Sequence, residues 1–177
     1  NWVPTFPNAR YLFGRIEWEH WQQEAIADIA GDVDLEIAEA VIDCAAVTND
    51  SIRPIIEAGL HELVDMDHQV TDEICLEPTP GHTPGHVSVV INSAGQRGVI
   101  TGDLMHHPVQ CALPGVASKF DHDIDRACET RKDFMTRYAD SDVLVFGTHF
   151  AAPTAGRFVS HGDSWRFQVS DTDTSEG

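Results

Sequence analysis

The chain has 177 residues and a formal charge of −18, because 29 acidic residues outweigh 11 Lys and Arg. Hydrophobic residues make up 42% and charged residues 23%, which excludes a disordered chain, a collagen and a coiled coil. No apolar run approaches the roughly 20 residues of a spanning helix, so we expect no membrane partner. So acidic a surface repels phosphate backbones, and we therefore expect no nucleic-acid partner.

The length suits one compact domain, and we expect residues 1–177 to form it. The four cysteines form no C-x-x-C pair, so we expect reduced thiols that are mostly buried. No signal peptide is visible within the sequence, and we expect a cytoplasmic protein.

The first part of the chain is predicted to be mainly helical and the later part to contain most strands. Apolar spacing predicts, in chain order, helices over 18–29, 35–46 and 52–58, strands over 60–64 and 73–77, a rigid loop over 78–86, strands over 87–91 and 98–101, a His- and Pro-rich loop, a helix over 123–139, a strand over 143–146 and a final hairpin over 157–169. Helices and strands mix without strict β-α-β alternation, which predicts an α+β or layered-sandwich fold.

Three of the predicted strands are followed by a glycine and then by a side chain that can bind a metal ion. The segments are Gly81-His82, Gly102-Asp103 and Gly147-Thr148-His149. Glycine lets the backbone turn sharply, and loops beyond rigid strand ends can converge on one point. A single His or Asp in such a place is more often a solvated loop residue or a turn former. Two imidazoles and one carboxylate together favour a metal site, because they are ligands of hydrolytic zinc and a carboxylate can bridge two ions.

The same segments resemble a known family. PGHTPGH at 80–86, TGD at 101–103 and GTH at 147–149, in this order, resemble the downstream motifs of the metallo-β-lactamase fold. TFPNA at 5–9 and GDLMHH at 102–107 resemble its lactonase and organophosphate-hydrolase branch. The resemblance covers nearly the whole chain and implies an α+β fold, namely the later, C-terminal part of an αββα sandwich.

The resemblance also implies a ligand set for a pair of zinc or other divalent ions. His82 would bind the first ion, His149 the second, and Asp103 would bridge both. Asp103 would also be catalytic. His106 and His107 follow it by three and four residues, and one of them could face the substrate and donate to a leaving-group oxygen; we take His106 as the catalytic one. The alternative is that both simply line a polar loop. For His86 we expect a supporting hydrogen bond beneath the ligands and not a metal bond.

The implied function is hydrolysis of esters or lactones by a metal-bound hydroxide, and the acidic surface favours small neutral substrates. However, the sequence lacks the H-x-H-x-D-H motif that supplies four further ligands in this family. We therefore expect a domain truncated at its N-terminus, whose exposed sheet face is covered by a homodimer partner or by a retained N-terminal fragment. The alternative is a non-catalytic, metal-poor remnant of the fold that serves as a binding or assembly module.

Overall fold

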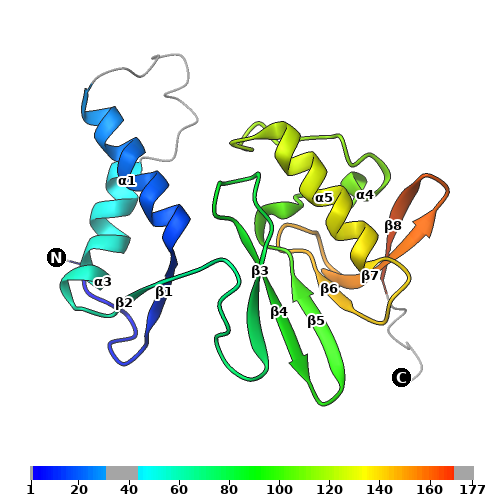
Figure 1. Ribbon diagram of the computed structural model, residues 1–177, viewed down its shortest axis with the longest axis horizontal. Helices are drawn as coiled ribbons and strands as arrows, with labels where there is room; N and C mark the ends of the chain where they lie inside the picture. The colour runs from blue at the N-terminus through cyan, green and yellow to red at the C-terminus, as the bar shows by residue number, and fades with distance from the viewer. Residues whose placement is uncertain (1, 31–43, 170–177) are drawn as a thin grey trace. The chain divides into compact units, whose positions relative to one another are not determined.

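A computed structural model describes residues 2–30 and 44–169 of the chain (Figure 1). The chain divides into two compact units, Asn1–Asp65 and Met66–Gly177. The expectation of one domain over residues 1–177 remains a prediction. Most of the helix predicted over 35–46 lies outside the described residues. No helix in the described ranges is long and apolar enough to cross a membrane.

The first unit is a pair of parallel strands with helices between them. Strand β1 (Tyr11–Gly14) pairs with β2 (His61–Val64), and helix α1 (Arg15–Ala30) follows β1 directly. Parallel strands need a long crossover, which the helical residues between β1 and β2 help to supply. Before β2 a continuous helical segment is formed by α2 (Cys44–Val47), a π-helical turn (Thr48–Ile52) and α3 (Arg53–Glu57).

The second unit is a six-stranded sheet with one long helix, α5 (Ile124–Tyr138). The strand order is β3-β4-β5-β6-β7-β8, with bounds Ile74–Pro78, Val87–Ser93, Gln96–Ile100, Leu144–Phe146, Ala155–His161 and Ser164–Gln168. Every neighbouring pair is antiparallel except β5 and β6, which are parallel and joined through α5. The predicted α+β class is therefore confirmed, and these strands lie within about two residues of their predicted positions.

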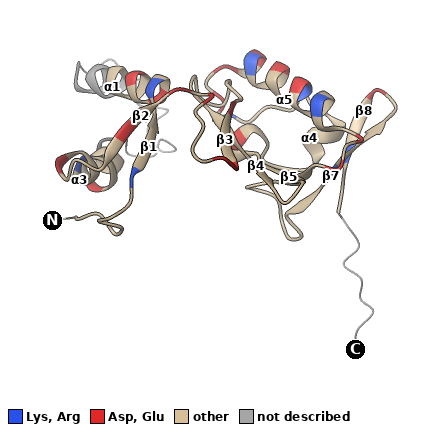
Figure 2. Cartoon of the chain, turned by 60° about the horizontal axis from the view of Figure 1, so that its bottom comes forward, with Lys and Arg blue, Asp and Glu red and all other residues tan. Residues whose placement is uncertain are grey.

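The core of this unit lies between α5 and one face of the sheet (Figure 1). Val90, Val99 and Val145 are paired in register across three strands and are at most 1% exposed. They belong to the same buried cluster as Phe134 and Met135 of α5, both 0% exposed. Figure 2 shows acidic and basic positions interleaved along this helix, as expected for a helix with one apolar and one solvated face.

The segment between β5 and α5 contains more regular structure than the predicted loop. It begins with a 3-10 helix, η2 (Gly102–Leu104), and includes a short helix, α4 (Val109–Ala112). The buried side chain of Gln110 organises this segment. Its Oε1 accepts from the backbone nitrogens of His106 and His107 at 2.7 and 3.2 Å, and its Nε2 donates to the Val116 carbonyl at 2.9 Å. These side-chain contacts to the backbone leave no periodic apolar pattern in the sequence.

Candidate metal centre

The predicted site residues follow strands that end at the same edge of the sheet. Strands β3 and β5 are both antiparallel to β4, and β6 is parallel to β5, so β3, β5 and β6 run in one direction. His82 follows β3, Asp103 lies in η2 after β5, and His149 follows β6. The structure brings the three together: His82 Nε2 lies 3.4 Å from Asp103 Oδ2, and His149 Nε2 lies 2.8 Å from Asp103 Oδ1.

Two of the preceding glycines are required by the backbone and by close packing. Gly81 has φ +139°, and an added Cβ would lie 2.4 Å from the backbone of Ala127 in α5. Gly102 has φ +57°, and an added Cβ would lie 2.8 Å from Nε2 of His86. A side chain at either position would therefore combine an unfavourable φ with a steric clash. The two glycines let the segments that carry His82 and Asp103 approach their neighbours closely.

His86 connects the end of β3 to the backbone of Asp103. The Asp103 backbone nitrogen donates to His86 Nε2 at 2.9 Å. Because Nε2 accepts, a neutral His86 carries its proton on Nδ1. That nitrogen lies 3.0 Å from the Thr79 carbonyl oxygen and 2.8 Å from Thr79 Oγ1. The side chain thereby positions the main chain at Asp103.

His82 has a second carboxylate on its other ring nitrogen, which the sequence analysis did not find. His82 Nδ1 lies 3.0 Å from Oδ1 of Asp121, whose side chain is fully buried. The other oxygen, Oδ2, accepts from the Ser118 backbone nitrogen at 2.9 Å and lies 3.7 Å from a terminal nitrogen of Arg131. The two residues are 39 positions apart in sequence, so no local motif indicates their contact.

His106 and His107 have different environments. The His106 ring centre lies 5.1 Å from that of His82 and 4.8 Å from that of His149. Its buried Nδ1 has no hydrogen-bond partner in the described part of the chain. Burial, and then the positive charges of His82 and His149, lower the pKa of His106. The Nδ1 atom of His107 instead accepts a hydrogen bond of 3.0 Å from the backbone nitrogen of Val109, at the start of α4.

The electrostatics of Asp103 favour its ionised form. Partial burial raises its pKa, but the hydrogen bond from His149 and the charges of His82 and His149 outweigh burial and lower the pKa overall. A carboxylate that remains ionised between two imidazoles is a suitable shared ligand for cations.

The donor set fits zinc in kind but falls short in number. Two imidazole nitrogens and a carboxylate are ordinary zinc ligands, and a carboxylate on the far nitrogen of His82 is the usual support for a metal-bound histidine. Within residues 2–30 and 44–169, however, no group of three or more His, Cys, Asp or Glu has the arrangement of a metal site. His82 and His149 contact Asp103 directly instead.

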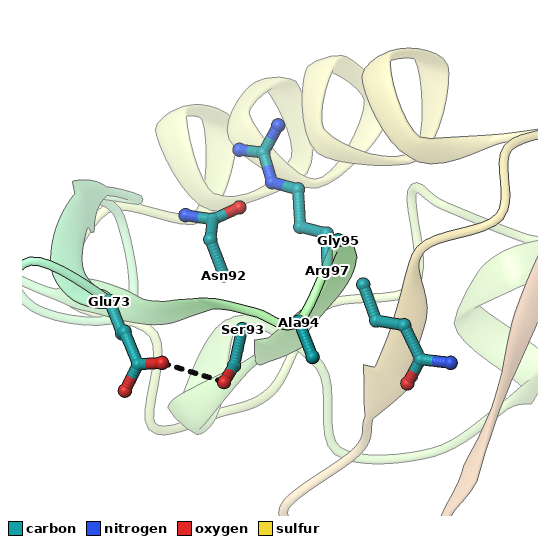
Figure 3. A pocket seen from close by; sticks show the side chains of 7 residues that line it. Glu73, Asn92, Ser93, Ala94, Gly95 and Arg97 are labelled. Carbon is teal, nitrogen blue, oxygen red and sulfur yellow. Dashed lines mark hydrogen bonds between the residues drawn. The ribbon is translucent and has the colours of Figure 1, made fainter.

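A separate hollow of about 320 Å³ lies at the β4–β5 hairpin (Figure 3). It is lined by Glu73 and residues 92–97, and Ser93 Oγ donates to Glu73 Oε1 at 2.7 Å. None of the predicted site residues lines it. It is therefore distinct from the cluster around Asp103.

The fold is shared with solved hydrolase structures. No protein-family model matches the sequence, and a search of curated proteins found no match. The chain is similar to the hydrolase AbOPH of the β-lactamase superfamily, with a TM-score of 0.78 and 24% identity over 92% of this chain and 55% of that one. It is also similar to AidC, a dizinc quorum-quenching lactonase solved with an N-acyl-homoserine product (TM-score 0.73, 23% identity, 92% and 55% coverage). A third is a probable metal-dependent hydrolase from Staphylococcus aureus (TM-score 0.61, 16% identity, 92% and 53% coverage).

The chain thus has the fold of metallo-β-lactamase superfamily hydrolases, as the motifs predicted. It spans about half the length of these solved structures. At identities below 25%, the likeness establishes the fold. The roles of the site residues and the activity need a separate argument from the geometry.

Proposed function

We propose that this chain carries part of the active site of a metal-dependent hydrolase that opens small neutral esters or lactones. One observation carries the proposal: the Nε2 atoms of His82 and His149 converge on the two oxygens of a single carboxylate, Asp103. Imidazole nitrogens and a carboxylate are ligands of zinc and other divalent ions, and one carboxylate can be shared by two ions. The fold supports the same reading, since AbOPH is described as a hydrolase and AidC as a dizinc lactonase.

Within this proposal His82 holds one ion, His149 holds the other, and Asp103 is shared. When bound, such a metal pair polarises a carbonyl oxygen and lowers the pKa of water. The chain's other residues fix the geometry. His86 holds the backbone of Asp103 at 2.9 Å, and Asp121 holds the ring of His82 at 3.0 Å.

We assign His106 to the leaving-group side of the substrate. Its ring lies near those of both His82 and His149, and burial and the charges of these two residues lower its pKa, which favours the neutral imidazole. A neutral imidazole can donate one hydrogen bond from its ring N–H to a leaving-group oxygen. The formal charge of −18 disfavours anionic substrates, which supports neutral lactones and esters over phosphodiesters.

The test is metal analysis and a substrate panel on the native protein from its source. We expect about two equivalents of zinc after dialysis and turnover of lactones in preference to β-lactams, thioesters and phosphotriesters. Asp103→Ala should remove both. Asp123→Asn is the matched control, because Asp123 caps α5 through the Arg126 nitrogen and Asn is as good a cap. An Asp103→Ala protein with full metal content and rate would refute the assignment, and turnover of β-lactams alone would refute the substrate class.

The second candidate is a metal-poor binding or assembly module. It is favoured by the shortage of donors, since three described side chains cannot give each of two ions the three protein ligands of a typical catalytic zinc site. The same experiment separates the two functions. A native protein that retains no metal and hydrolyses nothing on the panel would refute the metal-dependent hydrolase and favour the module.

A further inference from the structure

The buried Asp121 carboxylate links three segments around the candidate site. It contacts His82 through Oδ1 at 3.0 Å and accepts the Ser118 backbone nitrogen through Oδ2 at 2.9 Å. Its side chain and that of Arg131 are both 0% exposed. A buried carboxylate is costly unless it is paired and hydrogen-bonded. The buried Asp121 carboxylate must therefore be stabilised by the groups around it.

Arg131 supplies the positive charge and ties the same group to Asp103. Its Nη2 atom lies 3.7 Å from Asp121 Oδ2 and has no hydrogen bond of its own in the described part of the chain. Its Nε donates to the carbonyl of Leu104, the residue after Asp103, at 3.1 Å. Its Nη1 donates to the Pro114 and Val116 carbonyls at 2.9 and 3.1 Å. The guanidinium of Arg131 thus faces the Asp121 carboxylate that contacts His82, and it also binds the backbone of the segment that carries Asp103.

We infer that Asp121 is a positioning residue that fixes the tautomer of His82, with Arg131 as its counter-charge. An ionised Asp121 can only accept, so a neutral His82 must carry its proton on Nδ1. The lone pair is then on Nε2, the atom that faces Asp103 at 3.4 Å. This inference rests on the proposed function only in taking a metal ion as the ligand of Nε2.

Asp121→Asn separates this role from simple packing, because Asn has nearly the same shape. The Ser118 N–H and the Arg131 guanidinium both face the Oδ2 position, so the single amide oxygen should turn to them. The amide NH2 then faces His82 Nδ1, which must accept, and the proton moves to Nε2. His82 Nε2 would no longer offer a lone pair to an ion.

The experiment uses the native protein labelled with ¹⁵N-histidine. His82 is recorded by NMR without metal at about pH 8.5, above the usual imidazole pKa of about 6.5. We expect the Nδ1–H tautomer in the wild type and the Nε2–H tautomer in Asp121→Asn. In a chelator competition, zinc affinity should fall about 10- to 100-fold in that variant. Asp123→Asn, the same change two residues along, should alter neither.

Each result decides the inference. An Nε2–H tautomer in the wild type would overturn it, whether or not the Asn variant folds. An unchanged tautomer and zinc affinity in a folded Asp121→Asn protein would overturn it as well. A tautomer switch in a protein whose wild type binds no zinc would support Asp121 as the positioning residue while refuting the proposed hydrolase. The two failures are therefore distinguishable.

Discussion

Replacing Gly102 by Ala tests whether the close approach of His86 to the Asp103 segment maintains the site. Gly102 has φ +57°, and the new Cβ would lie 2.8 Å from His86 Nε2, the atom that accepts the Asp103 backbone nitrogen. The positive φ alone costs about 1–2 kcal/mol for a residue with a side chain. Displacing His86 leaves the Asp103 nitrogen without its acceptor, which adds about 1–3 kcal/mol.

Gly162 provides a control with the same backbone but without the clash. Its φ is +60°, and a Cβ added there would meet nothing within 4 Å. The positive φ should lower the free energy of unfolding of both Ala variants. Only Gly102→Ala should also lose the hydrogen bond from the Asp103 nitrogen to His86. The difference in the free energy of unfolding between the two variants therefore isolates the contribution of His86.

The assay is urea unfolding of both variants, with zinc affinity measured alongside. We expect Gly102→Ala to be about 1–3 kcal/mol less stable than Gly162→Ala and to bind zinc more weakly, while Gly162→Ala binds zinc as the wild type does. Equal stabilities of the two variants, with equal zinc affinities, would show that His86 does not hold the Asp103 segment.

The remaining predictions concern ligand roles, metal retention and alkaline stability. His82→Ala should lose more metal than His86→Ala, because only the former removes a proposed metal bond, and equal losses by metal analysis would show that the wrong histidine was chosen. Residues 1–177 expressed alone should retain less than two equivalents of zinc after dialysis, because each ion would be bound only by one histidine and by the Asp103 carboxylate that both ions share. Full retention would contradict the ligand assignment. Burial raises the pKa of the Cys111 thiol from 9.0 to about 12, and burial with the Glu77 hydrogen bond raises that of Tyr138. The two groups therefore lose their protons at lower pH in the unfolded chain than in the folded one. Their contribution to the free energy of unfolding is fully present below about pH 8 and falls as pH rises toward 12. Urea midpoints that do not change over this range would exclude these groups as buried acids.

The sheet was predictable because its signals are local. Gly and Pro bound the apolar runs of β3, β4 and β5, and the turn at Ala94 and Gly95, both with positive φ, closes the hairpin. The proximity of His82, Asp103 and His149 could be predicted for the same reason, since each follows a glycine turn at the end of a predicted strand. Their roles as metal ligands remain a prediction.

Asp121 could not be found in this way because its position depends on how α5 docks. The backbone nitrogens of His122 and Asp123 donate to the carbonyls of His82 and Gly81, both at 3.0 Å. This pairing brings the start of α5 against the PGH turn, and it needs the bare Cα of Gly81 beside Ala127. In the sequence, Asp121 is only an acid in a polar loop. The contact arises from tertiary packing of segments 39 residues apart.

The face of the six-stranded sheet that points away from α5 carries a row of apolar side chains. Leu76, Val89, Ile100 and Phe146 are paired in register across β3, β4, β5 and β6, one position along from the buried valine row. Side chains alternate between faces along a strand, so this row lies on the face away from that row. Its members are only partly buried, and Ile100 is 37% exposed.

An apolar row of this kind is what a second layer covers in a sandwich. The match to the solved structures that share the fold covers 55% of their chains. The predicted cover, a homodimer partner or a retained N-terminal fragment, remains a prediction. The row ends beside the site, because Ile100 and Phe146 are the last residues of the strands that lead to Asp103 and His149. A layer packed on this face would therefore reach the same edge of the sheet, where His82, Asp103 and His149 meet.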